Sequence, residues 1–209
     1  MKIIEGSVEI INPIDYKTML NTTELAIRNC YQSYGKMNDN SAEGLIRGCI
    51  KANHGAGLEF GDICVKIVCD RATSHQLVRH RLCNFMQLSQ RYVNAVKNDP
   101  NIEFIEPEGL NNEAYDNWKG ACRVAESAYL VMINDCGMKP EVARSVLPNC
   151  TATTIFMKAN IREWRHILKL RCDKHAQNEI RNLMLDLLSK LYKMYPIFFE
   201  DLYNEFLGG

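Results

Sequence analysis

Three consecutive basic residues, Arg79, His80 and Arg81, stand inside the stretch QLVRHRLCNFMQLSQRYVN, residues 76–94. An arginine side chain presents a planar fork of donors that suits a phosphate group, and it keeps its charge even when it is partly buried. On their own, the three residues are explained equally well by a surface cluster of ion pairs. The apolar residues on both sides, among them Leu77 and Leu82, pull the segment toward the interior, where an unpaired cation is costly. The stretch therefore favours a binding site for an anion.

A second basic stretch, NIREWRHILKLRCDKHAQ, covers residues 160–177 and has helical spacing. On a helix, Arg162 and His166 are four residues apart and share a face. Arg171 follows nine residues after Arg162, about half a turn round the helix axis. We therefore expect the two arginines to address different ligands, or different parts of one ligand. A solvated amphipathic helix is the simpler interpretation, and for Arg165 and Lys169 we prefer it.

Two further segments carry residues that are less specific. NHGAGLEFGD, residues 53–62, places His54 and Glu59 in a glycine-bearing loop, where backbone can approach a ligand closely. A single loop histidine is more often structural than catalytic. Arg144, in VARSVLPNC, lies in a short helix between two prolines and would by itself be interpreted as a surface arginine.

Several common site signatures are missing from the chain. No glycine-rich dinucleotide fingerprint, P-loop, H-E-x-x-H pair or G-x-S-x-G turn occurs. Phosphates, if bound, are therefore held by dispersed arginines rather than by a glycine-rich loop. The nine cysteines include no C-x-x-C pair, and the chain begins without an apolar signal segment. We expect a reduced, cytoplasmic protein without a metal site.

Length and charge restrict the class of protein. The 209 residues fit one domain, and 25 basic residues balance 25 acidic ones. A general affinity for nucleic acid or for an anionic membrane is not expected, because both partners favour a basic excess. No run of 18 apolar residues occurs, so no transmembrane helix is predicted.

The two basic stretches must be positioned by a mixture of strands and long helices. The pattern predicts an edge strand over residues 7–15, stopped at Pro13, and a helix over residues 22–34 with Thr22 or Thr23 as its N-cap. Asp173 is the expected cap of the last long helix. Strands alternate irregularly with helices, so we predict an α+β fold, a single domain with an antiparallel sheet flanked by long helices. The other predicted elements are strands at 63–69, 101–107 and 150–160 and helices at 71–79, 112–136, 140–148, 161–171 and 174–195.

The two basic stretches together resemble a known family. RHRLCNFMQLS, an R-H-R followed by seven residues and a serine, matches the signature of the flavin-dependent thymidylate synthases, and SHQLVRHR and SQRY extend the match on both sides. Farther along, ARSVLP, NIREWRHILKLR and HAQNEIR resemble the second half of that family in order and spacing. NHGAGLEF resembles its H-x-x-x-x-E segment. The resemblance extends from about residue 26 to residue 203.

This resemblance implies an enzyme of nucleotide biosynthesis. Members of the family are α+β homotetramers in which FAD lies at subunit interfaces. They convert dUMP to dTMP, with 5,10-methylenetetrahydrofolate as the carbon donor and NADPH as the reductant of FAD. No cysteine nucleophile is needed, and no activating cation adjoins Cys83 in the sequence, so we expect Cys83 to be a packing residue.

The resemblance also implies a role for each matching residue. Arg171 matches the arginine that favours ionisation of the uracil ring, and His54 matches a histidine implicated around the flavin and the folate, so these two are the expected catalytic residues. The residues expected to contact the flavin are Ala56, Arg79, His80, Arg81, Gln87, Asn160, Arg162 and His166. Those expected to bind dUMP, mainly through its phosphate, are Gln76, Arg79, Gln87, Ser89, Gln90, Arg91, Arg144 and Arg171.

Three positions depart from the family pattern. Gln87 stands where many members carry glutamate, and it can form hydrogen bonds but cannot act as a base. Ala56 lacks the hydroxyl group often found at its position, so any contact there must be made by backbone. His166 stands where some members have asparagine. These departures qualify individual contacts and leave the arginines in place.

Two other functions fit parts of the sequence. A nucleic-acid-binding module would use the R-H-R and the aromatic residues, but the zero net charge argues against it. The second alternative is a helical interaction protein whose basic stretches only solvate its surface. A purified protein that carries flavin would support only the enzyme.

Overall fold

The computed structural model describes residues 1–11, 13–95 and 101–208. The chain forms two compact units. Unit 1 comprises residues 1–7, 67–79 and 86–155, and unit 2 comprises residues 8–66, 80–85 and 156–209. None of the helices in the described ranges combines the length and the hydrophobicity that crossing a membrane requires.

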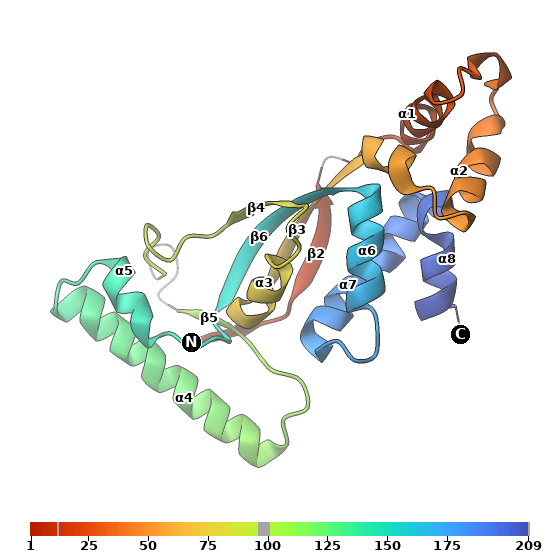
Figure 1. Cartoon of the computed structure of the whole chain (residues 1–209). Coiled ribbons are helices and arrows are strands. Elements are labelled where there is room, and N and C mark those ends of the chain that lie inside the picture. The colour runs from red at the N-terminus through yellow and green to blue at the C-terminus, as the bar shows by residue number, and fades with distance from the viewer. Residues whose placement is uncertain (12, 96–100, 209) are drawn as a thin grey trace. The chain divides into compact units, whose positions relative to one another are not determined.

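The strands form two sheets (Figure 1). The larger is a four-stranded antiparallel sheet in the order β2 (Ser7–Ile11), β3 (Asp62–Asp70), β6 (Ala152–Asn160) and β4 (Asn84–Gln87). The smaller pairs β1 (Lys2–Ile4) with β5 (Glu103–Ile105) in parallel, with Ile3 opposite Phe104. The expected antiparallel sheet is thus present, and the parallel pair was not expected.

Helices α6 (Ile161–Arg171), α7 (Asn178–Met194) and α8 (Pro196–Phe206) surround the core of unit 2. Trp164 is fully buried there, and its Nε1–H donates to the backbone oxygen of Ile63 at 2.9 Å. Phe198 and Leu187 are also fully buried. Helices α1 (Tyr16–Asn29) and α2 (Ser41–Lys51) and the 3₁₀ turns η1 (Tyr34–Lys36) and η2 (Gly55–Phe60) belong to the same unit. Burial of this apolar surface fixes the direction of α6, which carries the second basic stretch.

Unit 1 is built round the long helix α4 (Asn112–Leu130), which continues as a π-helical turn, η3 (Val131–Asp135) (Figure 1). Its core contains Phe104, Cys122 and Tyr129, all almost fully buried. Unit 1 also contains α3 (Arg71–Leu77), α5 (Pro140–Ala143) and the 3₁₀ turn η4 (Arg144–Val146). Helix α3 follows β3 directly because Asp70 caps it, accepting the backbone N–H of Thr73 at 2.5 Å.

Most of the predicted elements are confirmed, but several boundaries were wrong. The strand predicted over residues 7–15 is β2, an edge strand as expected, and it ends at Ile11; Asn12 lies outside the described residues. The first helix begins at Tyr16, capped by Asp15, rather than at Thr22 or Thr23. The carboxylate of Asp15 accepts the backbone N–H of Thr18, three residues later. This capping bond starts the helix earlier in the chain than we expected.

The last long helix was also expected to begin too early. Asp173 accepts the backbone N–H of His175 in the turn after α6, and α7 begins only at Asn178. The chain therefore does not continue as a helix from Arg171 to His175, and these two residues do not share a helix face. The C-terminal residues form a separate helix, α8, because Pro196 occupies its first turn. Strands β1 and β4 and helix α2 were not expected.

Candidate active site

Helix α6 positions three of the expected site residues in unit 2. The helix begins at Asn160, whose Oδ1 accepts the backbone N–H of Glu163 at 2.9 Å. It ends at Arg171, where the N–H of Cys172 donates to the carbonyl oxygen of Leu168. The capping bond uses the oxygen of Asn160 and leaves the amide nitrogen as the group that can donate to a ligand.

Arg162 and His166 line one pocket of about 300 Å³ in unit 2, together with Gly55, Lys169 and Glu205 among others. The helical spacing predicted that these two residues share a face, and the common pocket confirms it. Arg162 donates to Glu59 at 2.5 Å, with both side chains about half exposed. An exposed ion pair adds little stability, so its main effect is on where the guanidinium lies.

Gly55 leaves room for Arg162. A Cβ atom at position 55 would lie 3.0 Å from Nε and 3.2 Å from Cδ of Arg162. Such a separation is shorter than an ordinary contact, so any larger side chain would displace the arginine. The glycine in NHGAGLEF is thus part of what places Arg162.

Arg165 makes a different kind of contact. It donates to both carboxylate oxygens of Asp201, at 2.7 and 2.6 Å, and also to the backbone oxygen of Phe198. This bidentate pair joins α6 to α8. Arg165 is therefore a structural residue, but its side chain is only 15% exposed, so the expectation that it lies on a solvated helix face is wrong.

Arg171 lines a second pocket of unit 2, about 420 Å³ in volume. His166 borders both pockets, whereas Arg162 borders only the first of them and Arg171 only the second. The half-turn separation of the two arginines predicted this division. The side chain of His175, also at the second pocket, is paired with Asp173 at 2.7 Å.

His80 lies against Arg171. The Nε–H of Arg171 donates to Nε2 of His80 at 3.1 Å, and His80 is only 7% exposed. Burial lowers the pKa of His80 to about 4, assisted by the positive charge of Arg171 and by His166. Burial likewise lowers the pKa of Arg171. Since the pKa of His80 lies well below 7, its ring is neutral at neutral pH.

Unit 1 contains a polar network round Gln87. The Nε2 group of Gln87 donates to Ser74 Oγ at 2.8 Å and more weakly to Thr153 Oγ1 at 3.4 Å. Arg71 Nη1 donates to the same Thr153 oxygen at 3.2 Å and to the carbonyl oxygen of Leu88 at 3.3 Å. The orientation of the Gln87 amide is thereby fixed, and its side-chain oxygen keeps the capacity to accept a hydrogen bond from a ligand.

Arg71 and Arg144 bring two positive charges together beside this network. Burial lowers the pKa of Arg71, and the nearby charge of Arg144 lowers it further. Like charges held close together repel each other, and an anion between them would remove that cost. A dianionic phosphate monoester has the charge and the acceptor oxygens that two guanidinium groups prefer.

Three further nucleotide-binding candidates of unit 1, Ser89, Gln90 and Arg91, follow shortly after the end of β4. Ser89 and Gln90 line a pocket of about 300 Å³. Ser89 Oγ accepts the backbone N–H of Arg91 at 3.3 Å, and the exposed guanidinium of Arg91 lies 5.2 Å from the ring centre of Tyr92. Gln76, in α3, is half-buried.

The expected site residues thus divide between the units. Of the residues expected to bind dUMP, all but Arg171 lie in unit 1. They are Gln76, Arg79, Gln87, Ser89, Gln90, Arg91 and Arg144. Unit 2 contains the remaining residues: His54, Ala56, His80, Arg81, Asn160, Arg162, His166 and Arg171.

The R-H-R segment itself corrects one expectation. Arg79 and Arg81 are exposed, and only His80 is buried. Of the apolar flanks, Leu77 is fully buried as expected, but Leu82 is 77% exposed and Met86 is 75% exposed. The expectation that the arginines lie among buried apolar side chains is therefore wrong for the single chain.

Three other predicted residues have simple environments. Ala56 lies in η2 and His54 directly before it, and both side chains are exposed. The backbone N–H of His54 donates to the carbonyl oxygen of Cys49. Burial, assisted by the negative charge of Glu163, raises the pKa of Cys83 to about 12. A thiol with that pKa is protonated at neutral pH, which agrees with a packing role.

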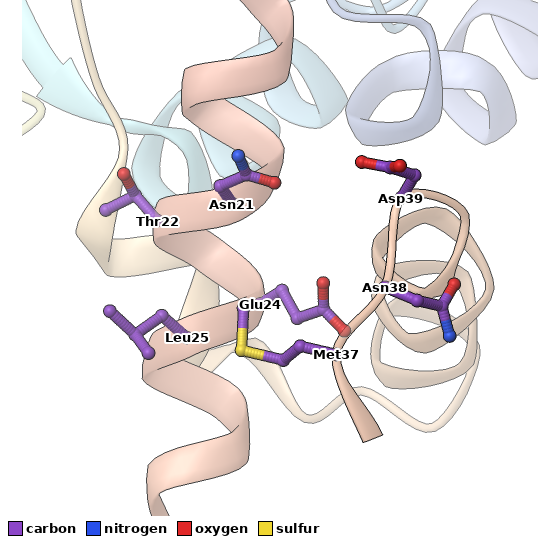
Figure 2. Close-up of a pocket in the computed structure, with 7 residues that line it drawn as sticks. All are labelled: Asn21, Thr22, Glu24, Leu25, Met37, Asn38 and Asp39. Carbon is purple, nitrogen blue, oxygen red and sulfur yellow. The ribbon is translucent and has the colours of Figure 1, made fainter. Parts of the chain in front are cut away.

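A further pocket, of about 510 Å³, lies between α1 and the turn before α2 and contains none of the expected site residues (Figure 2). The carboxylate of Glu24 at its wall accepts from Arg28 at 2.7 Å and from Ser41 at 2.6 Å. Glu24 is 1% exposed and Arg28 is 8% exposed, so this is a buried, satisfied ion pair. Its contacts explain how α1 and α2 are held together and indicate no chemistry.

Sequence reasoning missed the supporting residues of the unit 1 network. No sequence motif includes Arg71, Ser74 or Thr153, and the last two are buried. The available signal was that Arg71 opens a helix directly after an apolar strand, only eight residues before Arg79. No pattern in the sequence indicated that the charge of Arg144 would act on Arg71.

The donor sets fit the groups that the resemblance implies. The pocket round Arg162 offers a guanidinium, an imidazole and a close backbone approach at Gly55, which suit the diphosphate of FAD. Among the described residues, no group of three or more His, Cys, Asp and Glu side chains is arranged to hold a metal ion.

Comparison with known proteins agrees with this geometry. A family model described as thymidylate synthase complementing protein matches residues 14–197. The chain is 34% identical over 197 residues to the flavin-dependent thymidylate synthase of Mycolicibacterium gilvum (strain PYR-GCK), a match that covers 85% of this chain and 77% of that protein. It is 36% identical over 201 residues to the protein of the same name from Mycobacterium sp. (strain JLS), covering 85% and 78%.

A solved structure has the same fold. The UMP/dUMP methylase PolB from Streptomyces cacaoi, bound with 5-Br dUMP, superposes with a TM-score of 0.83 over 99% of this chain and 98% of that one. Its sequence identity is 22%, so this likeness concerns the fold alone. The family match and the curated relatives extend beyond fold, and they confirm the resemblance carried by the R-H-R stretch. The chain therefore belongs to the family of the flavin-dependent thymidylate synthases, the thymidylate synthase complementing proteins.

Proposed function

We propose that the protein methylates dUMP to dTMP with bound FAD, takes its carbon from 5,10-methylenetetrahydrofolate and uses NADPH as the reductant. The observation that carries the proposal is the similarity, over 85% of the chain, to proteins named flavin-dependent thymidylate synthase. The pair of arginines in unit 1, Arg71 and Arg144, supports it independently, because that pair suits a nucleotide phosphate.

Two of the flavin-binding residues in this proposal, Arg162 and His166, line pockets of unit 2. Arg162 and His166 would bind the cofactor by donating to its diphosphate, and Asn160 would contribute its amide nitrogen. Arg79, His80, Arg81, Gln87 and the backbone at Ala56 complete the set by resemblance. When bound, the flavin would supply hydride chemistry that no amino-acid side chain offers.

The dUMP-binding residues in this proposal lie mainly in unit 1. Arg144, with Arg71, would hold the phosphate, and Gln76, Ser89, Gln90 and Arg91 would orient the nucleotide. Gln87, held by Ser74, would present its carbonyl oxygen. His54 is the proposed residue for the folate.

Arg171 has the role of stabilising negative charge on the uracil ring. A guanidinium placed where an anion develops, in a site that excludes water, typically contributes about 3–4 kcal/mol to the transition state. Arg171 is half-buried and its pKa is lowered by burial, so its charge acts in surroundings of reduced polarity. An arginine keeps its proton despite such a shift.

We propose in addition that the active form is a homotetramer. The exposed apolar side chains round the R-H-R, Leu82, Met86, Leu88 and Tyr92, support association, because a monomer gains nothing from presenting them to water. Light scattering coupled to gel filtration measures the mass. A monomeric mass at assay concentration, together with full activity, would contradict the tetramer.

The direct test is tritium release from 5-tritiated dUMP. The purified protein should be yellow, with the visible absorbance of oxidised flavin, and release should require FAD, NADPH and methylenetetrahydrofolate together. Omission of any one component is the control, and UMP in place of dUMP tests the sugar. A colourless protein that binds no added FAD, or release that is independent of the folate, would refute the proposal.

A further inference from the structure

His80 and Arg171 come from distant parts of the sequence and meet in the interior of unit 2. Arg171 is the last residue of α6, and His80 lies in the turn after α3. The Nε–H of Arg171 donates to Nε2 of His80 across 3.1 Å. Acceptance at Nε2 requires that this nitrogen carry no proton, so the neutral ring has its proton on Nδ1.

The surroundings of His80 keep it in this form. Its side chain is buried, and the two groups that act on it electrostatically, Arg171 and His166, both come from α6. The ring of His166 lies edge-on to that of His80, with centres 6.4 Å apart and planes at 80°. Both neighbours disfavour a second proton, since each adds or can add positive charge.

The bond engages one particular donor of the arginine. A guanidinium has five N–H groups in a rigid plane, and Nε carries only one of them. A hydrogen bond at Nε restrains the orientation of the plane and does not itself occupy the terminal nitrogens. Because His80 is neutral, this bond places no negative charge beside the guanidinium, whereas a carboxylate would.

We propose that His80 is a positioning residue for Arg171, which it holds in the orientation needed to face the uracil ring. The inference rests on the proposed function, since it assumes that Arg171 acts on the pyrimidine. It gives the middle residue of the R-H-R a role in orienting another side chain, besides the flavin contact implied by the family.

Two amide variants separate this role from a merely structural one. In His80→Gln the side-chain oxygen reaches about as far as Nε2 and can accept from Arg171, whereas in His80→Asn it reaches only as far as Nδ1. We expect kcat for tritium release to fall on the order of 10- to 100-fold in His80→Asn, as misplacement by about 1 Å can cause. KM for dUMP should change little, and His80→Gln should recover most of the loss. Flavin absorbance per chain should be equal in the two variants.

Equal losses of kcat in both variants would overturn the proposal and assign His80 to packing or to the cofactor alone. A second measurement does not depend on turnover. In protein labelled with ¹⁵N-histidine and free of substrate, the Nε2 signal of His80 should be that of an unprotonated nitrogen. Arg171→Ala should shift this signal and raise the pKa of His80.

An Nε2 signal that Arg171→Ala leaves unchanged would overturn the positioning role. If wild-type protein formed no dTMP from dUMP under any combination of cofactors, the proposed function would fail. The NMR result would then still decide whether the histidine holds the arginine. The two failures are therefore distinguishable.

Discussion

Lowering the pH from 7 to 5 should destabilise the folded protein through His80. The pKa of this histidine is about 4 in the folded protein, compared with 6.5 for an ordinary histidine. Between these values the unfolded chain binds a proton that the folded chain does not, so acid favours unfolding. The contribution to stability is fully present above pH 6.5 and is lost as the pH falls toward 4.

The size of the effect follows from the two pKa values. One unit of pKa corresponds to about 1.4 kcal/mol, so the whole window is worth about 3 kcal/mol. Between pH 7 and pH 5 the loss is about 2 kcal/mol, because at pH 5 the unfolded histidine is almost fully protonated and the folded one is still neutral. This is a substantial fraction of the stability of an ordinary domain.

Urea unfolding followed by tryptophan fluorescence measures the loss. Trp164 is fully buried in unit 2, the unit that contains His80, and reports on its unfolding. Between pH 7 and pH 5, His80→Gln should lose about 2 kcal/mol less than wild type. His75→Gln, at an exposed position in α3, is the matched control and should lose as much as wild type. If His80→Gln showed the same pH dependence as wild type, the assignment of the buried neutral histidine would be refuted.

Three further predictions concern the proposed reaction. Arg171→Ala should retain FAD, measured by absorbance, but lower dTMP formation by about 10²- to 10³-fold, because it removes a charge needed only as the ring becomes anionic; near-normal turnover would show that the role is wrongly assigned. Arg144→Gln should raise KM for dUMP roughly 10-fold or more, as loss of a charged hydrogen bond does. It should also slightly raise the melting temperature of the ligand-free protein, since Arg71 no longer faces a second cation; an unchanged KM would contradict the phosphate role. Ser89→Ala should weaken turnover without eliminating it, because the hydroxyl accepts a backbone N–H of Arg91; complete loss with intact dUMP binding would point to a nucleophile instead.

Local patterns predicted the elements that carry the site. The helical spacing of the second basic stretch predicted α6, and a short helix was also expected where α3 lies. The residues that cap these helices, Asp70 and Asn160, are the last residues of the preceding strands and were not predicted as caps. The positions of Arg162 and Arg171 on separate sides of α6 followed from helical periodicity alone. Such features depend on neighbouring residues, and one sequence is enough to show them.

Contacts between distant residues were not predictable in the same way. The parallel pairing of β1 with β5 joins segments about 100 residues apart, and β1 is only three residues long. The bond from Arg171 to His80 joins residues 91 positions apart. The closeness of Arg71 to Arg144 likewise depends on how α3 and η4 fold in unit 1. No periodic pattern in the sequence indicates that these residues lie close together, because their proximity results from tertiary packing.

Burial was the least predictable property of the R-H-R segment. Apolar neighbours indicated an interior position, yet Leu82 and Met86 are exposed in the single chain. Hydrophobicity shows that a side chain favours leaving water, but it does not show whether its own chain or another molecule covers it.

The space at Gly55 has a practical consequence for anyone who modifies this protein. Replacing glycine by alanine is a common way to stiffen an unfolded chain and raise stability. At position 55 the added methyl group would meet the Nε and Cδ atoms of Arg162, so a change chosen for heat resistance would displace a side chain that we propose binds the flavin. Gly35, Gly44 and Gly48, where a methyl group meets nothing within 4 Å, are safer positions for that purpose.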